Sequence, residues 1–149
     1  MPQQIAHQIS VRKKVDFLRR IAFELIGDSL MSIEGHLSQY QFDGRDVVAR
    51  QETGILKRST VSPQFDFAVL RLEGDTIDRV FKGLVALGFN AIVHVQIERN
   101  GILELGAYDN FHPQCVATGP GISSSLLEEL QSANVIWDFK LASPTSRQP

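Results

Sequence analysis

The sequence predicts a single α+β domain, with three helices and a mostly antiparallel sheet of about five to six strands. Three segments repeat apolar residues at spacings of three and four, which is typical of amphipathic helices. Shorter segments between them alternate or cluster apolar residues as strands do, and an Asn-Gly pair indicates a hairpin. We expect the domain to span residues 1–142, followed by a disordered tail over residues 143–149.

The first helix is expected over residues 9–25 and ends before Gly27, which is a typical C-terminal stop. Its opening residues Arg12, Lys13 and Lys14 lie where the helix dipole disfavours positive charge. We expect them on a solvated face, with binding of phosphate or an anionic partner as the alternative. Its apolar face consists of Val15, Leu18, Ile21, Ala22 and Leu25.

Strand-forming segments follow on both sides of a polar stretch. Residues 30–42 alternate over short pieces and form one bent strand or two, with Gly35 as a bulge. Residues 47–54 are polar and are expected to form a loop, whereas residues 55–62 are β-prone and are expected to form a strand. Residues 65–73 are apolar on both faces, which predicts a central strand covered on both sides.

The second helix is expected to start at Asp75 as its N-cap and to stop at Gly88. It lies between the strand at 65–73 and the apolar segment 90–98, so the three elements could form a βαβ unit. Its buried stripe consists of Ile77, Val80, Phe81, Leu84 and Val85.

The hairpin that contains Asn-Gly is constrained by its apolar face. A two-residue turn would place Ile97 opposite Glu104 and so mix apolar and charged side chains. A three-residue loop over residues 99–101 instead pairs Ile97 with Leu103, which keeps one face apolar. We therefore expect the longer loop, with Gly101 in the left-handed conformation.

The third helix and a final strand complete the domain. Ser125 and Glu128 have the spacing of a capping box, and Asn134 lies near the end of the helical pattern. Residues 135–141 alternate as a half-buried strand does. Its inward-facing residues are expected to be Val135, Trp137, Phe139 and Leu141.

The composition of the chain limits the classes of protein to which it can belong. With 43% hydrophobic and 21% charged residues, the chain has the composition of a globular domain and lacks that of a disordered segment. Its apolar runs are too short for a membrane span, and its polar, basic N-terminus has no secretory core. The single cysteine, Cys115, excludes an internal disulfide. These observations predict a cytoplasmic protein.

Charge is distributed unevenly along the chain. Residues 1–20 carry a net charge of +4, whereas residues 100–139 contain five acidic residues and no Lys or Arg. The absence of positive charge in the later segment weighs against nucleic-acid binding there and favours a basic protein partner. The carboxylates expected to face this partner are Glu104, Asp109, Glu128 and Glu129.

Residues 106–122, GAYDNFHPQCVATGPGI, gather candidate catalytic groups. His112 could act as a base oriented by Asp109, and Cys115 could act as a nucleophile. In the structural interpretation Asp109 forms a turn, Phe111 fills the core and Cys115 is a small buried residue. We expect a structured corner with a buried, unreactive thiol.

The polar face of the hairpin is a second candidate site. His94 is expected opposite Gly106, whose missing side chain leaves room beside Tyr108 and Glu104. With His112 these residues could bind a small molecule, although a solvated sheet face is the simpler interpretation. The histidines show no metal-ligand spacing, and no phosphate-binding or cofactor motif is present, so we expect neither a metal nor a cofactor.

Three functions fit these observations. The favoured one is a small cytosolic protein-interaction domain, such as an inhibitor or immunity-type protein, that binds a basic partner through its acidic surface. The first alternative is a small-molecule-binding domain that uses the hairpin face around His94, Gly106 and Tyr108. The second is a small hydrolase that uses His112 or His94. The absence of a catalytic motif favours a role other than catalysis.

Overall fold

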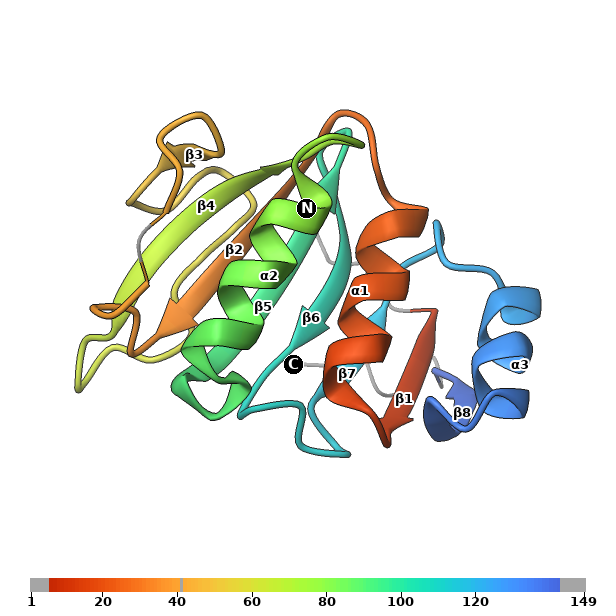
Figure 1. Cartoon of the computed structure of the whole chain (residues 1–149). Coiled ribbons are helices and arrows are strands. Elements are labelled where there is room, and N and C mark those ends of the chain that lie inside the picture. The colour runs from red at the N-terminus through yellow and green to blue at the C-terminus, as the bar shows by residue number, and fades with distance from the viewer. Residues whose placement is uncertain (1–5, 41, 143–149) are drawn as a thin grey trace.

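The computed structural model describes residues 6–40 and 42–142, so the expected disordered tail at 143–149 lies outside the described residues. It is an α+β fold with one antiparallel sheet (Figure 1). The strands are β1 (His7–Val11), β2 (Ser29–Gly35), β3 (Val47–Ala49), β4 (Asp66–Leu72), β5 (Ile92–Arg99), β6 (Ile102–Ala107), β7 (Val116–Thr118) and β8 (Ile136–Leu141). The helices are α1 (Lys14–Glu24), α2 (Ile77–Leu87) and α3 (Ser124–Ser132), with a short 3-10 turn, η1 (Phe89–Ala91).

The sheet has eight strands in the order β3-β4-β2-β5-β6-β7-β1-β8. The predicted α+β class and three helices are confirmed within the described residues, but the prediction of five to six strands is wrong. The strands that sequence reasoning missed are β1, β3 and β7, which have only three to five residues each. Such short strands give too few alternations to be recognised, and the second half of β1 overlaps the segment predicted as the first helix.

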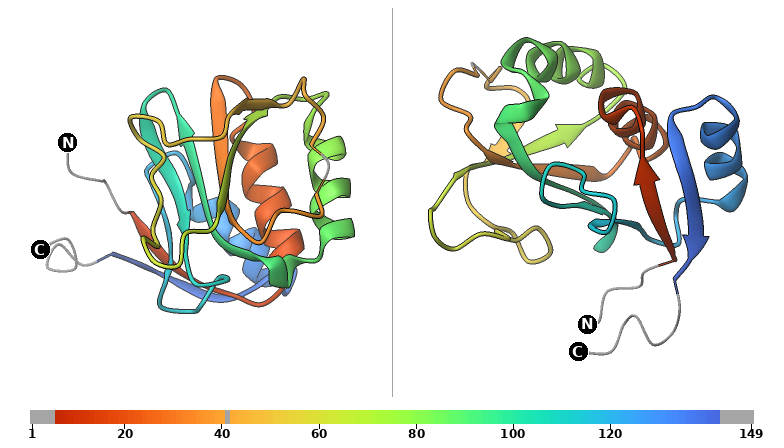
Figure 2. Two further views of the ribbon diagram at one scale, coloured as in Figure 1. Left: turned by 90° about the vertical axis from the view of Figure 1, so that its left-hand side faces the viewer. Right: turned by 90° about the horizontal axis from the view of Figure 1, so that it is seen from below.

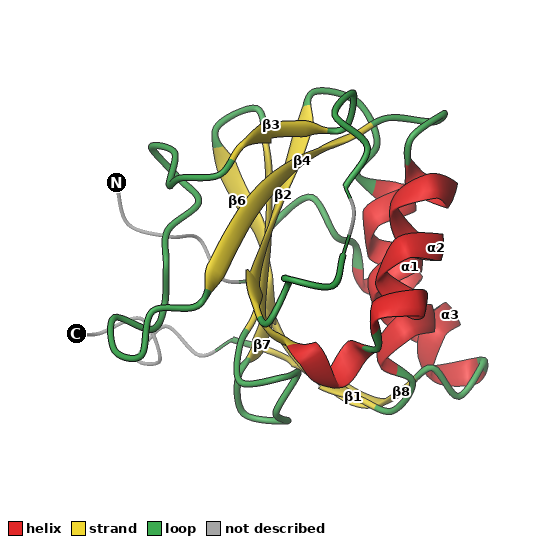
Figure 3. Ribbon diagram, turned by 60° about the vertical axis from the view of Figure 1, so that its left-hand side comes forward, coloured by secondary structure: helices red, strands yellow, loops and turns green. Residues whose placement is uncertain are grey.

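Each helix connects two strands that run in the same direction. α2 joins β4 to β5 with β2 between them, and α3 joins β7 to β8 with β1 between them. The expected βαβ unit is therefore present in a split form, because an antiparallel strand separates its two parallel strands. All three helices lie on one face of the sheet, which we call the helix face (Figure 3).

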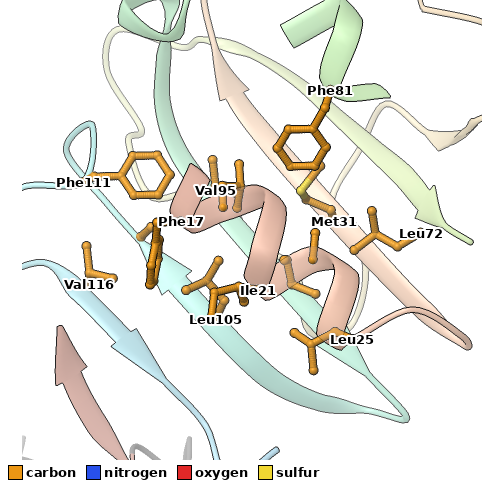
Figure 4. Packing of buried hydrophobic residues seen from close by; sticks show 14 of the residues in the cluster. Phe17, Ile21, Leu25, Met31, Leu72, Phe81, Val95, Leu105, Phe111 and Val116 are labelled. Atoms are coloured by element: carbon orange, nitrogen blue, oxygen red, sulfur yellow. The ribbon is translucent and has the colours of Figure 1, made fainter. Parts of the chain in front are cut away.

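The main core lies between the helices and the sheet (Figure 4). Phe17 and Ile21 of α1 and Phe81 of α2 have no exposed surface, and neither do Val95 and Leu105 of the central strands. Burial of each such side chain stabilises the fold by about 1.5–3 kcal/mol relative to exposure. This packing accounts for the apolar stripes that identified the helices, but the expectation that Val85 belongs to the buried stripe of α2 is wrong, because Val85 is 56% exposed.

The opposite face of the sheet, the back face, is partly covered by residues 50–65, which we call the back loop (Figure 2). Leu56 of this loop is fully buried and packs with Phe67 and Val69 of β4. β4 is thus covered on both sides, as predicted for residues 65–73, although it lies next to the edge strand. The predicted strand at 55–62 is wrong, because this segment lies over the sheet without pairing with it.

The β5–β6 hairpin has a two-residue turn. Asn100 and Gly101 have φ values of 53° and 80°, as a type I′ turn requires, so the left-handed Gly101 is confirmed and the three-residue loop is wrong. The register then shifts between Ile97 and Glu98, so that Ile97 pairs with Leu105. A bulge, not a longer loop, keeps the apolar side chains on one face.

The pairing of β1 with β8 also shifts, between Ser10 and Val11. At this shift Ile136 is buried at 2% exposure and Trp137 is 61% exposed, and Leu141, the last residue of β8, is 75% exposed. The expectation that Trp137 and Leu141 face the core is therefore wrong. The shift interrupts the simple alternation at Trp137, whereas Leu141 is exposed at the end of the strand.

The helix starts also differ from the expected ones. α2 has Thr76 as its N-cap residue where Asp75 was expected. α3 is capped by Ser123, whose Oγ accepts the N–H of Leu126, and not by Ser125. The expected stop at Gly88 is confirmed, since this residue has a φ of 98° that favours glycine.

Candidate functional site

His94, the centre of the predicted ligand pocket, has both ring nitrogens engaged. The backbone N–H of Asp109 donates to Nδ1 at 3.1 Å, so the ring proton resides on Nε2, which donates to Oγ1 of Thr60 at 2.7 Å. The ring therefore ties the turn after β6 to the back loop. Neither nitrogen is available for acid–base chemistry while these bonds persist.

The space expected above Gly106 is filled by the side chain of Tyr108. A Cβ at position 106 would lie 2.7 Å from Oη of Tyr108. Gln96 donates from Nε2 to that Oη at 3.0 Å and accepts the N–H of Lys57 at 3.0 Å. Burial raises the pKa of Tyr108, so its phenol stays protonated at neutral pH. The expected pairing of His94 with Gly106 is wrong, because the register shift pairs Gly106 with Gln96. His94, Gly106 and Tyr108 still lie near one another, but they form an internal network and not an open pocket.

Glu34 of β2 holds the back loop in place and was missed by sequence reasoning. The side chain is 1% exposed, and its carboxylate accepts the N–H groups of Ser59 at 2.9 Å and Thr60 at 3.2 Å. A carboxylate of this kind is stable in the interior because charged acceptors make strong hydrogen bonds. The available signal was the single charged residue of the strand sequence SLMSIEG.

Glu104 of β6 is buried at 6% exposure and was expected at the surface. Its Oε1 accepts the N–H of Gly121 at 2.9 Å, and its backbone carbonyl accepts the N–H of Gly119 at 2.9 Å. A Cβ on either glycine would collide with Glu104. The Gly-Pro-Gly loop before α3 thus surrounds a carboxylate of the protein itself.

The corner after β6 is structured, as expected. Asp109, Asn110 and Phe111 have φ values of 55°, 53° and 62°, which are uncommon for residues other than glycine. The Asn110 side chain stabilises this turn by donating to the carbonyls of Phe89 at 2.8 Å and Ile92 at 2.6 Å. Phe111 is 2% exposed and fills the core, as the structural interpretation proposed.

His112 and Cys115 lie close together at this corner. Nδ1 of His112 accepts the N–H of Gln114 at 3.2 Å, and the Cys115 Sγ lies 4.0 Å from the same nitrogen. That nitrogen is therefore already occupied, and the thiol is at the outer limit of a hydrogen bond. Cys115 is half-buried, so it is less enclosed than expected.

The four carboxylates expected to face a partner lie in different places. Glu104 is buried, and Asp109 is exposed in the turn after β6. Glu128 and Glu129 are exposed on α3. Glu129 accepts a hydrogen bond from Arg20 of α1 at 2.5 Å, which connects it to the helix face.

A groove of about 630 Å³ opens on the helix face between α1 and the start of α2. Phe23 lies in it with 59% of its surface exposed, and the buried Ile77 forms part of its wall. The groove is lined by Asp16, Arg19, Arg20, Phe23, Gly74, Ile77 and Asp78. Sequence reasoning missed it, although a phenylalanine on the polar side of an amphipathic helix is a recognisable signal.

The charges around this groove are predominantly negative. Arg19 pairs with Asp78, and Arg20 pairs with Glu24 at 3.4 Å as well as with Glu129. Asp16 forms no ion pair within residues 6–40 and 42–142. The lining itself holds two carboxylates and two arginines, and negative charge predominates once Glu24 and Glu129, which pair with Arg20 from outside the lining, are counted.

A second depression, of about 450 Å³, lies where the back loop meets β4. Arg50 and Arg58 line it, but Arg58 already donates to the carbonyl of Phe65 at 2.6 Å and lies 5.0 Å from the ring centroid of Phe67. These contacts anchor the back loop. Only Arg50 is left to attract an anion, so this depression is a weaker candidate than the groove.

Arg79 of α2 anchors the segment that leads into β3. Its guanidinium donates to both carboxylate oxygens of Asp46, at 2.8 and 2.7 Å, and these bonds raise the pKa of Arg79. The Asp46 side chain is 3% exposed, so the pair is shielded from solvent on one side. This cluster has a structural role.

No family model, curated protein or solved structure matches this chain. The described part of the chain also contains no group of three or more His, Cys, Asp or Glu side chains placed to hold a metal ion. None of its helices is long and apolar enough to cross a membrane. The function is therefore inferred from the geometry alone.

Proposed function

We propose that this protein is a protein-binding module that docks a basic, amphipathic segment of a partner in the groove between α1 and α2. The observation that carries the proposal is Phe23, which is 59% exposed within a groove of about 630 Å³. Large exposed apolar side chains inside a concavity, surrounded by charged groups, are typical of binding surfaces. An apolar anchor of the partner would contact Phe23 and the wall formed by Ile77.

The basic character of the partner follows from the charges of the groove. Asp16 has no ion-pair partner within the described residues, so a lysine or arginine of the docked segment can pair with it. Glu129, one of the carboxylates chosen from the sequence, belongs to this charged rim through Arg20. An inhibitor or immunity-type role is the narrower form of the same proposal.

The internal use of the candidate catalytic groups favours binding over hydrolysis. His94 has both nitrogens hydrogen-bonded, and Nδ1 of His112 accepts the N–H of Gln114. A small-molecule pocket at the hairpin would require the Tyr108 ring to leave its place over Gly106. Docking at the helix face requires no such rearrangement.

The proposal can be tested by site-specific photocrosslinking in the native host. A photoreactive phenylalanine analogue replaces Phe23 in one variant and Val85 in the matched control, since Val85 is also exposed, at 56%, but lies outside the groove. We expect one discrete adduct at position 23 that is absent at position 85. Identical adducts at both positions would contradict docking in the groove.

The electrostatic part of the proposal is tested with the partner so identified. Asp16→Lys should slow association most strongly at low ionic strength, because rim charges act mainly through steering. Lys82→Glu, on the exposed side of α2, is the control for a change in net charge. If Asp16→Lys left the association rate unchanged at low salt, the basic character of the partner would be excluded.

A further inference from the structure

The two edges of the sheet differ in length and regularity. β3 has three residues, and its pairing with β4 shifts between Val47 and Ala49, so this edge is short and irregular. β8 has six residues, and no strand of the described residues pairs with its outer side (Figure 2). A longer unpaired strand is a template on which another chain can extend the sheet.

The backbone groups available at this edge follow from the β1–β8 ladder. The N–H of Ala142 donates to the carbonyl of Ala6 at 2.9 Å, so residue 142 directs its backbone groups toward β1. Successive residues of an antiparallel strand direct these groups to alternate sides. Phe139 and Leu141 therefore present their N–H and C=O groups outward.

We propose that two copies of this chain dimerise by antiparallel pairing of their β8 strands about a two-fold axis at Phe139. In this dimer Phe139 lies opposite its own copy and exchanges two backbone hydrogen bonds with it. Trp137 of each copy lies opposite Leu141 of the other. These two side chains, 61% and 75% exposed, then cover each other.

Symmetry and charge select this register. Directly opposed residues must direct their side chains to the same face, so a symmetric pairing must be centred on a residue and not between two residues. Centring on Asp138 would oppose two aspartates, and centring on Lys140 would oppose two lysines. When the pairing is centred on Phe139, Asp138 of each copy lies opposite Lys140 of the other copy. Both of these pairs occupy positions without backbone hydrogen bonds, where opposed side chains are closest.

The surroundings of β8 are compatible with this pairing. Asp138 and Lys140 line an open depression of about 490 Å³ and are exposed, so both can reach a second copy. Gln131 of α3 donates to the Trp137 carbonyl at 3.1 Å, but a carbonyl oxygen can accept a second hydrogen bond. Because pairing of one short strand buries little area, we expect a dissociation constant of about micromolar or weaker.

The test combines charge reversal with mixing, followed by sedimentation equilibrium of the full chain. Asp138→Lys and Lys140→Asp each replace two attractive pairs by two repulsive ones, so each should weaken self-association by about tenfold or more. An equimolar mixture of the two variants should dimerise again, because lysines at 138 and 140 then face aspartates. The double variant that exchanges both charges should also dimerise.

Lys82→Glu is the control, because it changes the net charge on the exposed side of α2. Trp137, the single tryptophan of the chain, provides a second readout, since pairing should shift its fluorescence to shorter wavelength as the concentration rises. A wild-type chain that stays monomeric up to millimolar concentration would overturn the proposal. So would a dimer that Asp138→Lys does not weaken, or variants that fail to associate when mixed.

Discussion

The contact between Glu34 and the back loop can be tested by replacing Glu34 with glutamine. The change preserves the size of the side chain but leaves one oxygen to accept the N–H groups of Ser59 and Thr60, which now bond to separate oxygens at 2.9 and 3.2 Å. One buried N–H then faces an amide group that can only donate. A hydrogen bond to a charged acceptor contributes about 1.5–3 kcal/mol, partly offset here by the removal of a buried charge.

We therefore expect Glu34→Gln to lower the free energy of unfolding by about 2 kcal/mol, measured by urea denaturation. If the loop detaches locally, hydrogen exchange at Ser59 and Thr60 should accelerate by about 30-fold, which corresponds to the same free energy. Glu52→Gln is the matched control: Glu52 also accepts a loop N–H, from Arg58 at 2.7 Å, but it is exposed. Unchanged stability and exchange in Glu34→Gln would refute the anchoring role.

Two further predictions concern stability. Gly35→Ala should destabilise the fold by about 3 kcal/mol in urea denaturation, because its Cβ would collide with the backbone carbonyl of Ala91. Gly54→Ala is the control and should change the stability little, since no atom lies within 4 Å of the added Cβ. Equal losses of stability in the two variants would contradict the close approach at Gly35. Burial lowers the pKa of His7. Below about pH 6.5 the unfolded chain therefore binds a proton at this residue more readily than the folded chain does. The free energy of unfolding should consequently fall as the pH drops through this range. His7→Gln should lack this part of the pH dependence, and an identical pH profile would exclude His7 as its source.

Long periodic segments of this chain are predictable from sequence, and short ones are not. The stripe of α2 and the two apolar faces of β4 identified both elements, because each pattern extends over at least seven residues. β1 is separated from α1 by only two residues, so the apolar residues at the end of β1 were assigned to the helical pattern that follows. The back loop has β-prone residues, but its backbone N–H groups at Ser59 and Thr60 are bonded by Glu34 and not by a neighbouring strand.

For the candidate site on the hairpin face, the sequence predicted which residues lie together but not how their side chains are arranged. His94, Gly106 and Tyr108 were grouped correctly by strand alternation. Alternation gives the face of a side chain but not its rotamer, and the rotamer of Tyr108 decides that the space over Gly106 is filled. The exposure of Trp137 depends on a register shift between two strands that are more than a hundred residues apart, which no local pattern reports.

The position of β1 has a consequence for folding during synthesis. His7 pairs with Thr118 and with Leu141, so both partners of the first strand are made long after it. At about 5–20 residues per second, the ribosome needs on the order of 10 s to make the intervening chain. β2, β4, β5 and β6 can pair with one another during that time, while Ile9 and Val11 of β1 stay exposed to solvent or to a chaperone. Ribosome-bound chains that stop before β7 should therefore be protected from protease over β2–β6 but cleaved within β1.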